Sequence, residues 1–575
     1  MIRTSLTPLG LPLTGLLLAL CATLPAQDQP QKPAADIPAL THKELGRMWP
    51  FEHAPVDFFQ AEYGFKPTQA WLDAARLASL RYAEWCSASF VSPRGLIMTN
   101  HHCARDNVVA VTPKGQDWLS TGFFAKSLEE EVKVPGLTVQ QLVSMKDITA
   151  AMNEGITKDL EGDELKAAID ANEKKILEQA DKDEADFTHQ VVSLYQGGDY
   201  QLYTYKVYRD IRLVACPDLK IATFGGDPDN FTYPRFSLDF SFVRAWENDK
   251  PADTSMHYFK VKTRGPKEGE TVFVTGNPGS TGRLDTIAQM EFLRDLEYPA
   301  IIRQIDGRLK QLRKHKDDDS GEDIRGEILN LENSYKAYVG YLDGLKTAVV
   351  METKRKAEQE LREAVAKNTE LTAKIGDPWK RIEEIVAEKR EIVRTRKGFE
   401  RFQQLDQEIE LLAKRVGEAF FAVYGTKLPP DATFTLRLSD GVVKGYPMNG
   451  TLAPFFTSLY GMYARNAEFG GKDPFALEPA WLDKIKELDM TTPFCLVSTC
   501  DIIGGNSGSP MIDSNLNVVG LVFDGNIESL GNRFIYTDAV ARTVCVHPAM
   551  IVEALRKIYG AGKLADEFEG KGTGY

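Results

Sequence analysis

Two short motifs constrain this 575-residue chain more than any other feature. One is the glycine-rich segment Gly504-Gly505-Asn506-Ser507-Gly508-Ser509-Pro510, and the other is Thr99-Asn100-His101-His102-Cys103, about 400 residues earlier. A serine hydroxyl is a poor nucleophile unless a base lies beside it and backbone N–H groups face the developing oxyanion. If both motifs serve one reaction, the fold must bring these two distant loops together.

The glycine before Ser507 fits such a role. Because Gly505 has no Cβ, the backbone can turn so that the N–H groups of Gly505 and Ser507 converge on one point. An ordinary Gly/Ser turn is the alternative, since strings of this kind are common. The histidine motif favours catalysis, because the pair is similar to the nucleophile and base loops of chymotrypsin-like serine proteases. We take His102, next to the cysteine, as the base, with His101 as the alternative.

The segment before the histidines reads as a hairpin. Residues 89–91 and 95–99 are two short apolar runs around a Ser-Pro-Arg-Gly turn. Such a hairpin would bring Cys86 and Cys103 together, so we expect a disulfide that pins the histidine loop. A structural, hydrogen-bonded core histidine remains the alternative for either His101 or His102.

The third catalytic group must be an acid, and residues 224–244 offer three. Leu238, Phe240 and Phe242 alternate with polar residues, which predicts a half-buried strand that Asp239 begins. Asp227 and Asp229 lie in a Gly/Pro-rich turn, where local backbone hydrogen bonds are the common role. Composition alone does not choose among the three.

Taken together, the motifs resemble the bacterial dipeptidyl-peptidase 7 and 11 family, secreted serine exopeptidases of the chymotrypsin clan. The matching segments are residues 46–49, 89–103, 224–241, 434–438, 504–510 and 523–526, which span nearly the whole mature chain. The resemblance implies a catalytic triad of His102, Asp239 and Ser507, with the Gly505 and Ser507 amides as the oxyanion hole. It also implies release of N-terminal dipeptides from oligopeptides through an acyl-enzyme, without metal or cofactor.

The same resemblance makes Asp524 the carboxylate that binds the substrate's free α-amino group. The residues add their own argument, because 509–512 and 518–523 read as two strands joined by a turn near Asn515. That hairpin would return Asp524 beside Ser507. A blocked amine would then leave a buried carboxylate unpaired. An Asp-Gly turn that merely closes a strand is the alternative for Asp524.

Four further residues match family positions around the substrate. Asn230 and Asn333 match positions that hold the substrate's N-terminus, and Phe231 stands where many relatives have tryptophan. Gly525 stands where acidic-specific relatives carry arginine. Because glycine offers no positive charge, we expect a hydrophobic residue at the substrate's second position.

The predicted fold class is mixed β and α, a chymotrypsin-like double β-barrel with an inserted α-helical cap. Residues 46–267 read as the first barrel, with a helical insertion near 139–187, and 268–283 open the second barrel. In 284–425, apolar residues recur at helical spacing between many charged ones, which predicts the cap. Residues 426–560 complete the second barrel, and 561–575 form a C-terminal tail. A long coiled coil is the alternative for the cap, but Gly376-Asp377-Pro378 interrupts it.

The N-terminus predicts export. Residues 1–26 resemble a signal peptide, with Arg3, an apolar core and Pro25-Ala26 before polar residues, and 27–45 form an extension. We therefore expect a periplasmic or secreted protein with no membrane anchor after cleavage. The net charge of −13 gives no basic face for nucleic acid. Cys216, Cys495, Cys500 and Cys545 allow three further disulfide pairings, and zinc is disfavoured because no Cys-x-x-Cys pair occurs.

Two rival functions remain open. A periplasmic endopeptidase of the same clan would share the triad without needing Asp524, and an inactive homologue would bind peptides without cleaving them. The family resemblance also suggests a homodimer. Asn506 occupies the place where zymogen-type relatives have an aspartate that pairs with a newly cut N-terminus, so we do not expect activation by that route.

Overall fold

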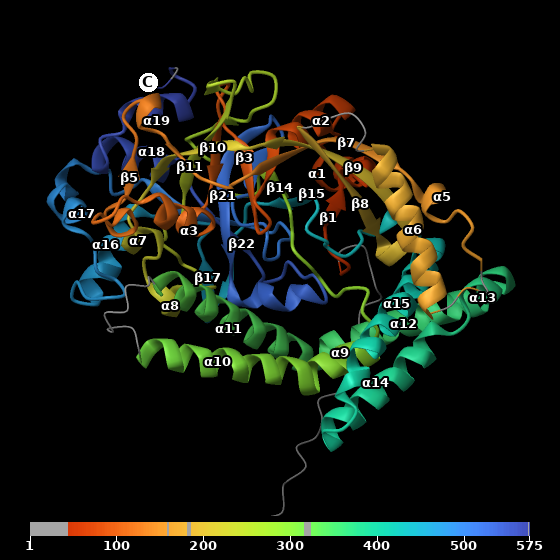
Figure 1. The fold of residues 1–575 in the computed structure, drawn as a ribbon. Coiled ribbons are helices and arrows are strands. Elements are labelled where there is room, and N and C mark those ends of the chain that lie inside the picture. Colours follow the sequence, from red (N-terminus) through yellow and green to blue (C-terminus); the bar gives the residue numbers. More distant parts are fainter. Residues whose placement is uncertain are drawn as a thin grey trace, which may run out of the picture. The chain divides into compact units, whose positions relative to one another are not determined.

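The structure is a computed structural model that describes residues 44–157, 160, 162–180, 186–314, 324–572 and 574. The predicted signal peptide lies outside these residues, as does the extension except Glu44 and Leu45. The described chain is mixed α and β, with an eleven-stranded sheet, a nine-stranded sheet and a two-stranded hairpin. The helices of residues 287–424 gather below the strands in Figure 1.

The eleven-stranded sheet has the order β5-β10-β11-β4-β3-β2-β7-β9-β8, with β12 and β6 as side partners, and all of its pairs are antiparallel. Its strands are β2 Ser79–Tyr82, β3 Cys86–Phe90, β4 Leu96–Thr99, β5 Phe123–Phe124, β6 Val132–Lys133, β7 Val139–Asp147, β8 Phe187–Leu194, β9 Asp199–Tyr208, β10 Asp210–Cys216, β11 Ser241–Glu247 and β12 Lys250–Pro251.

The nine-stranded sheet has the order β1-β15-β14-β20-β21-β22-β19-β18, and β13 pairs in parallel with β21. Its strands are β1 Met48–Pro50, β13 Lys260–Val261, β14 Thr271–Gly276, β15 Arg437–Val442, β18 Phe456–Ser458, β19 Pro493–Ser498, β20 Pro510–Asp513, β21 Asn517–Gly525 and β22 Thr543–Val546. The separate hairpin joins β16 Tyr446–Met448 to β17 Thr451–Ala453.

The pairing within the described residues does not close either sheet into a barrel, so the double β-barrel is not confirmed. In each sheet at least one end strand is only two or three residues long, which leaves little backbone for a closing ladder. Buried apolar side chains of both sheets and of the neighbouring helices form one large hydrophobic cluster, and each sheet contributes a second, smaller one.

The sheets cross the boundaries that the sequence predicted. Strands β1 and β13 lie inside the range 46–267 assigned to the first barrel, yet both pair in the nine-stranded sheet. The predicted helical insertion near 139–187 is also wrong at its start, because Val139–Asp147 forms strand β7 between β2 and β9. Among the described residues of this range, only α5 Thr149–Met152 and α6 Gly162–Ala180 are helical. Long-range pairing decides these segments, and local pattern cannot show it.

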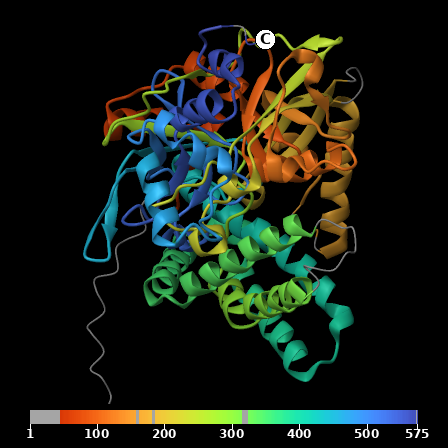
Figure 2. The ribbon, with the colours of Figure 1, turned by 90° about the vertical axis from the view of Figure 1, so that its left-hand side faces the viewer.

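The interval predicted as a cap is helical. It contains α9 Ile287–Phe292, α10 Tyr298–Lys314, α11 Arg325–Lys346, α12 Ala348–Ala366, α13 Thr369–Ile375, α14 Pro378–Thr395 and α15 Phe402–Tyr424. Thr286 starts α9 with a capping box to Gln289, and Asp377 caps α14, whose first residue is proline. Helices α10 and α11 run side by side in Figures 1 and 2.

The segment predicted as a C-terminal tail is part of the packed fold. Helix α19 (Gly562–Phe568) carries Glu567, whose buried carboxylate binds the Arg244 guanidinium of β11 through two oxygens at 2.7 and 3.0 Å. Five further helices connect strands along the chain: α1 Val56–Tyr63, α2 Gln69–Ala78, α3 His101–Val111, α8 Gly226–Asp229 and α18 Pro548–Glu553.

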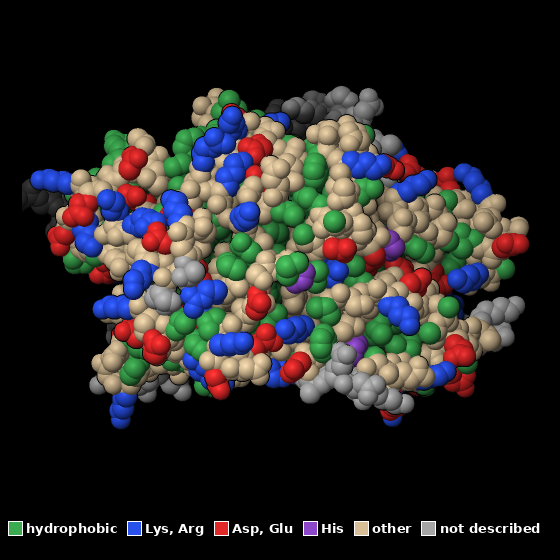
Figure 3. All heavy atoms as spheres, turned by 90° about the horizontal axis from the view of Figure 1, so that it is seen from above, with side chains coloured by type: hydrophobic (Ala, Val, Ile, Leu, Met, Phe, Trp, Pro, Cys, Tyr) green, Lys and Arg blue, Asp and Glu red, His purple; other side chains and the backbone are tan. Residues whose placement is uncertain are grey.

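The surface carries charges of both signs. On the face in Figure 3, Lys and Arg side chains are interspersed with Asp and Glu. Within the described residues, no helix combines the length and apolar character needed to cross a membrane.

Candidate active site

Ser507 lies in the loop between β19 and β20, and strand β3 of the other sheet holds this loop. The Ser87 N–H donates to the Ser507 carbonyl at 2.8 Å, and the Ser87 hydroxyl donates to the Gly505 carbonyl at 2.8 Å. Gly505 has φ +103°, and a Cβ there would lie 2.5 Å from the Asn277 carbonyl oxygen. The backbone therefore requires glycine at 505, as the sequence indicated.

The N–H groups of Gly505 and Ser507 are free to bind an oxyanion. In the part of the chain that the structure describes, neither donates a hydrogen bond to a protein acceptor. Backbone donors in a folded protein are otherwise almost always paired. Two unpaired donors on either side of Asn506 therefore suit a ligand oxygen.

The structure brings His102 to Asp239. His102 is the second residue of α3, and its Nδ1 lies 2.6 Å from Asp239 Oδ2. The His102 backbone N–H donates to Asp239 Oδ1 at 3.0 Å, so the carboxylate both orients the ring and satisfies the start of the helix. Asn100 fixes the Asp239 carbonyl through a 2.8 Å bond. Asp239 lies two residues before β11, and not on a strand as predicted.

Asp239 carries a negative charge at neutral pH, whereas the neighbouring His101 is neutral. Burial would raise the pKa of Asp239, but the charge and hydrogen bonds of His102 outweigh it and hold the pKa below its usual value. Burial lowers the pKa of His101 to about 4, although the Asp239 charge opposes the shift. His101 is thus neutral near pH 7, and its ring makes no hydrogen bond to Asp239.

The disulfide between Cys86 of β3 and Cys103 of α3 is present, as predicted. It joins the helix that carries His102 to the strand that holds the Ser507 loop. Both sulfurs lie close to His102, but a disulfide offers no thiolate to a metal ion. The other four cysteines named above are buried free thiols, so none of their three possible pairings forms.

One cavity of about 230 Å³ collects almost every residue singled out from the sequence. Its lining includes His102, Asp239, Ser507, Asp524, Gly525, Asn230, Phe231 and Asn333. Gly505 lies in the loop between two lining residues, Gly504 and Asn506. Segments that are about 400 residues apart in sequence therefore meet at one site.

Asp524 reaches this cavity by the predicted hairpin. Strands β20 and β21 are antiparallel, and the Gly508 N–H donates to the Val522 carbonyl at 2.9 Å, which places Ser507 opposite Phe523. The Asp524 carboxylate is buried and accepts from the Phe231 N–H at 3.0 Å. Burial raises its pKa, and the nearby Arg235 charge only partly offsets this effect.

The expectation that Asp524 lacks a partner without a substrate amine is wrong. Arg235 donates to Asp524 Oδ2 at 2.7 Å, and both side chains are more than nine-tenths buried. Arg235 also lies over the Phe523 ring at 5.4 Å. An incoming ammonium would share the carboxylate with this guanidinium.

The two asparagines meet across the cavity. Asn230, directly after α8, donates to Asn333 of α11 at 3.1 Å. Lys336, one turn further along α11, donates to the backbone carbonyls of Asp227 and Asn230. Phe231 has φ +55°, an uncommon backbone conformation for a bulky residue, which turns its N–H toward Asp524. Helix α11 thus covers the side of the cavity that holds Asn230.

Sequence reasoning missed two arginines at this site. Arg235 and Arg105 both line the cavity, and Arg105 donates to Asn330 of α11 at 2.7 Å. Arg105 lies one turn after His102 on α3, so helical spacing would have placed it on the same face. Arg235 follows a proline inside the matched segment 224–241, and only its long-range partner identifies its role.

Comparisons with known proteins find relatives over most of the chain. A family model described as Peptidase S46 matches residues 44–418 and 400–570. The chain is 24% identical over 672 residues to an Asp/Glu-specific dipeptidyl-peptidase of Capnocytophaga gingivalis, covering 88% of this chain and 94% of that protein. It is 23% identical over 651 residues to dipeptidyl-peptidase 7 of the same organism, covering 85% and 91%.

Solved structures show the same fold. The crystal structure of Porphyromonas endodontalis DPP11 in complex with substrate aligns with a TM-score of 0.78 and 18% identity, covering 91% of this chain and 99% of that one. The recognition of the dipeptidyl-peptidase 7 and 11 family, and with it the prediction of a serine-type dipeptidyl-peptidase, is confirmed. The chain belongs to the peptidase S46 family.

Proposed function

We propose that this chain removes dipeptides from the free N-terminus of oligopeptides, with Ser507 as nucleophile. The observation that carries the proposal is the short hairpin of β20 and β21, which puts Ser507 and the buried carboxylate of Asp524 into one cavity. A fixed negative charge near the nucleophile selects substrates whose ammonium lies a set distance from the scissile bond.

In this mechanism His102 takes the proton from the Ser507 hydroxyl as the oxygen attacks the second peptide carbonyl. Asp239 holds the ring through Nδ1 and stabilises the imidazolium that forms. The unpaired N–H groups of Gly505 and Ser507 stabilise the oxyanion. His102 then protonates the leaving amine, an acyl-enzyme forms on Ser507, and water releases the dipeptide.

We assign substrate N-terminus binding to Asp524 with Asn230, Phe231 and Asn333. The Asn230 side-chain oxygen is free to accept from an ammonium while its nitrogen donates to Asn333. Because Arg235 already neutralises part of the Asp524 charge, the amine adds a second cation to a paired carboxylate. An acetylated N-terminus would supply no such charge and would add bulk.

We further propose a hydrophobic second residue in the substrate. Gly525 adds no cation, and Ile502, Ile503, Val522 and Leu530 give the lining apolar character. The lining cations Arg105 and Arg235 are engaged by Asn330 and Asp524. Some relatives are named Asp/Glu-specific and others dipeptidyl-peptidase 7, so the second residue is the point to measure.

The remaining sequence-based expectations belong to the same proposal. They are export by the signal peptide to the periplasm or medium, a homodimer, and the predicted domain boundaries as amended by β1, β7, β13 and α19. Free oligopeptides are the substrates expected of such an enzyme.

The test compares dipeptidyl amides of a chromophore with their N-acetylated forms. We expect Asp524→Asn to lower kcat/KM for the free amine by about 30- to 1,000-fold. We expect Ser507→Ala to abolish turnover, and Asp253→Asn, an exposed carboxylate, to change nothing. Equal rates on free and acetylated substrates would favour the endopeptidase reading. No adduct with a serine-directed phosphonate at Ser507 would favour an inactive peptide-binding protein.

A substrate panel decides the side-chain preference separately. With the first residue fixed, we expect Leu, Met or Phe at the second position to exceed Asp and Glu by about tenfold or more in kcat/KM. Faster cleavage after Asp or Glu would overturn the hydrophobic preference and leave dipeptide release intact.

A further inference from the structure

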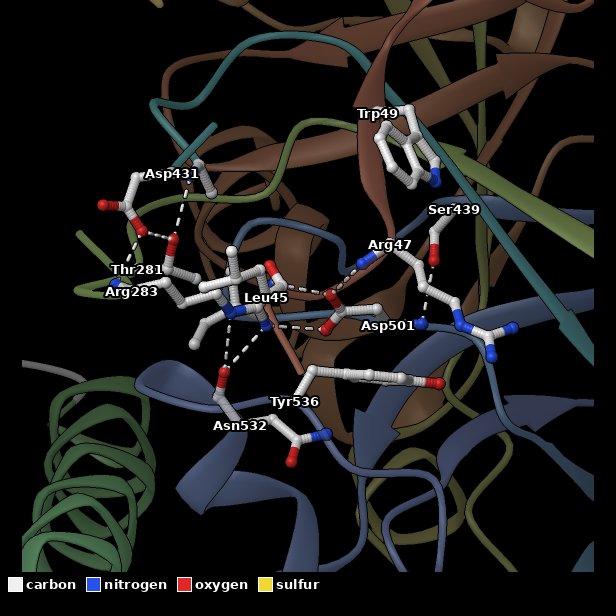
Figure 4. Close-up of polar contacts among 12 residues, drawn as sticks. Leu45, Arg47, Trp49, Thr281, Arg283, Asp431, Ser439, Asp501, Asn532 and Tyr536 are labelled. Atoms are coloured by element: carbon white, nitrogen blue, oxygen red, sulfur yellow. Dashed lines mark hydrogen bonds and ion pairs between the residues drawn. The ribbon is translucent and has the colours of Figure 1, made fainter. Parts of the chain in front are cut away.

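A buried ion pair lies at the base of the Ser507 loop. Asp501, six residues before Ser507, receives two hydrogen bonds from the Arg283 guanidinium, at 2.6 Å to Oδ2 and 2.8 Å to Oδ1. Asp501 is 1% exposed and Arg283 3% exposed. Figure 4 shows both side chains pointing toward each other, with Leu45, Arg47 and Asn532 around them.

Asp501 is fully engaged at the start of the loop. Its Oδ2 also accepts the Arg47 N–H at 2.8 Å, and its own N–H donates to Ser439 at 2.8 Å. From this fixed point the chain runs through Ile502 and Ile503, which line the cavity, to the oxyanion donors Gly505 and Ser507. The place of Asp501 therefore sets where the loop begins.

Arg283 also holds the opposite wall of the cavity. Its Nε and Nη2 donate to the Asn532 carbonyl at 3.1 and 2.7 Å. Asn532 belongs to the 3₁₀ helix Ile527–Arg533, which follows Asp524 and Gly525 and contains the lining residues Ser529 and Leu530. One guanidinium thus joins the wall that carries the nucleophile to the wall that carries the amine-binding carboxylate.

The backbone at residue 46 leaves room for the Arg283–Asp501 pair. Gly46 has φ +95°, and a Cβ there would overlap the Arg283 guanidinium and lie 2.5 Å from Asp501 Oδ2. The Leu45 carbonyl accepts a weak 3.4 Å bond from Arg283. The N-terminal segment can pass this close only because residue 46 is glycine. Gly46 belongs to the matched segment 46–49, and sequence analysis assigned that segment no role.

We propose that Asp501 and Arg283 are positioning residues for the Ser507 reaction, and this inference rests on the proposed function. Neither side chain lines the cavity, so they act through the loops they hold. A bidentate arginine–carboxylate pair fixes both distance and orientation, unlike a single hydrogen bond. The pair keeps the oxyanion donors at a fixed distance from the second cavity wall.

The experiment compares kcat, KM and the rate of phosphonate labelling of the variants Asp501→Asn and Arg283→Lys with those of the wild type. Asparagine keeps the shape of Asp501 but loses its charge, whereas lysine keeps the charge of Arg283 but cannot bridge both Asp501 oxygens and Asn532. We expect each variant to lower kcat by about 10- to 100-fold, since the oxyanion donors move away from their optimal place. We expect phosphonate labelling of Ser507 to slow by a similar factor, and KM to change by less than about threefold.

The matched control is Glu131→Gln, which removes a buried carboxylate 2.7 Å from Arg244 in the eleven-stranded sheet, away from the cavity. It should lower thermal stability and leave kcat per labelled site within about twofold of wild type. Circular dichroism and thermal unfolding establish that each variant is folded. If Asp501→Asn does not fold, Arg283→Lys decides the question.

Folded variants that turn over and label like Glu131→Gln would overturn the positioning role while the proposed function stands. A wild-type chain that the phosphonate labels but that releases no dipeptide would instead refute the proposed function. In that case the labelling rates of the variants still decide whether the pair positions Ser507.

Discussion

At the scale of single residues, the site depends on carboxylates that bind more than one group. The two oxygens of Asp239 accept separate bonds from the ring and from the backbone N–H of His102. Rotating the His102 ring would therefore break its bond to Oδ2, while Oδ1 stays occupied by the backbone N–H at the start of α3. The lowered pKa of Asp239, caused by His102 against the opposing effect of burial, keeps this carboxylate charged at neutral pH.

Replacing Asp239 with asparagine tests this arrangement. The amide keeps the volume but places an N–H₂ or a neutral oxygen against His102 Nδ1, so the ring loses its tautomer preference and its charge stabilisation. We expect kcat to fall about 10³- to 10⁴-fold with little change in KM, measured on a free-amine dipeptidyl substrate. Asp210→Asn, which removes a partly exposed carboxylate paired with Arg212, is the control. A loss of less than tenfold for Asp239→Asn would contradict the assignment.

The sequence indicated the residues that meet in the cavity better than the residues that hold them in place. Ser507, His102 and Asp239 all line the cavity, and they stand in motifs whose residue types the proposed reaction requires. Arg235 and Arg283 were not predicted, because an arginine's partner is set by tertiary contacts that no spacing reveals. Their burial is the physical signal, since a buried guanidinium needs hydrogen-bond acceptors, which are carboxylates for these two, but burial is known only from the fold.

At the scale of secondary-structure elements, local signals were reliable where a turn fixes the partner. The turn-forming residues 513–517 join β20 to β21, so the register that returns Asp524 to Ser507 was predictable. Strand β1 has three residues and pairs with β15 almost 400 residues later, which no local pattern could indicate. Strand β7 lies in a range whose charged pattern favours a helix, and its pairing with β2 and β9, about 60 residues away on either side, decides otherwise.

Asp285, just before the helices of 287–424, has a raised pKa. Burial, together with the neighbouring Asp431, raises the pKa of Asp285 to about 6, although Lys354 of α12 opposes the shift. The folded pKa thus lies above the unfolded value of about 3.9. Stability from this group is fully present below about pH 4 and is lost as the pH rises through about 6.

Asp285→Asn should therefore stabilise the protein only at higher pH. The neutral amide avoids burying a charge, so we expect Tm to rise by about 1–3 °C at pH 8 and to stay unchanged at pH 3.5. Differential scanning calorimetry at both values measures this. Asp343→Asn, a mostly exposed carboxylate on α11, should shift Tm at neither pH. An equal shift of Asp285→Asn at both pH values would show that the charge is not the cause.

At the scale of the whole molecule, the first described residues pack against the nine-stranded sheet, whose strands β19 and β20 flank the Ser507 loop. Strand β1 pairs with β15, the Arg47 N–H binds Asp501, and the Tyr536 N–H donates to the Glu44 carbonyl at 2.9 Å. These groups are internal backbone amides and carbonyls, which a preceding residue does not alter. Asn506, where zymogen-type relatives have aspartate, instead bonds locally to Ile503 and Ser509.

Activity should therefore not require a new N-terminus near Ser507. We expect a chain with an uncleavable polar tag fused ahead of residue 27 to keep kcat/KM within about threefold of the untagged chain, because within the described residues the contacts that hold the loop use backbone groups and side chains. By contrast, Gly46→Ala should lower kcat in the tagged and untagged chains alike, since its Cβ would displace Arg283 from Asp501. Activity that appears only after proteolysis between the tag and residue 47 would show that the loop needs a terminal ammonium after all.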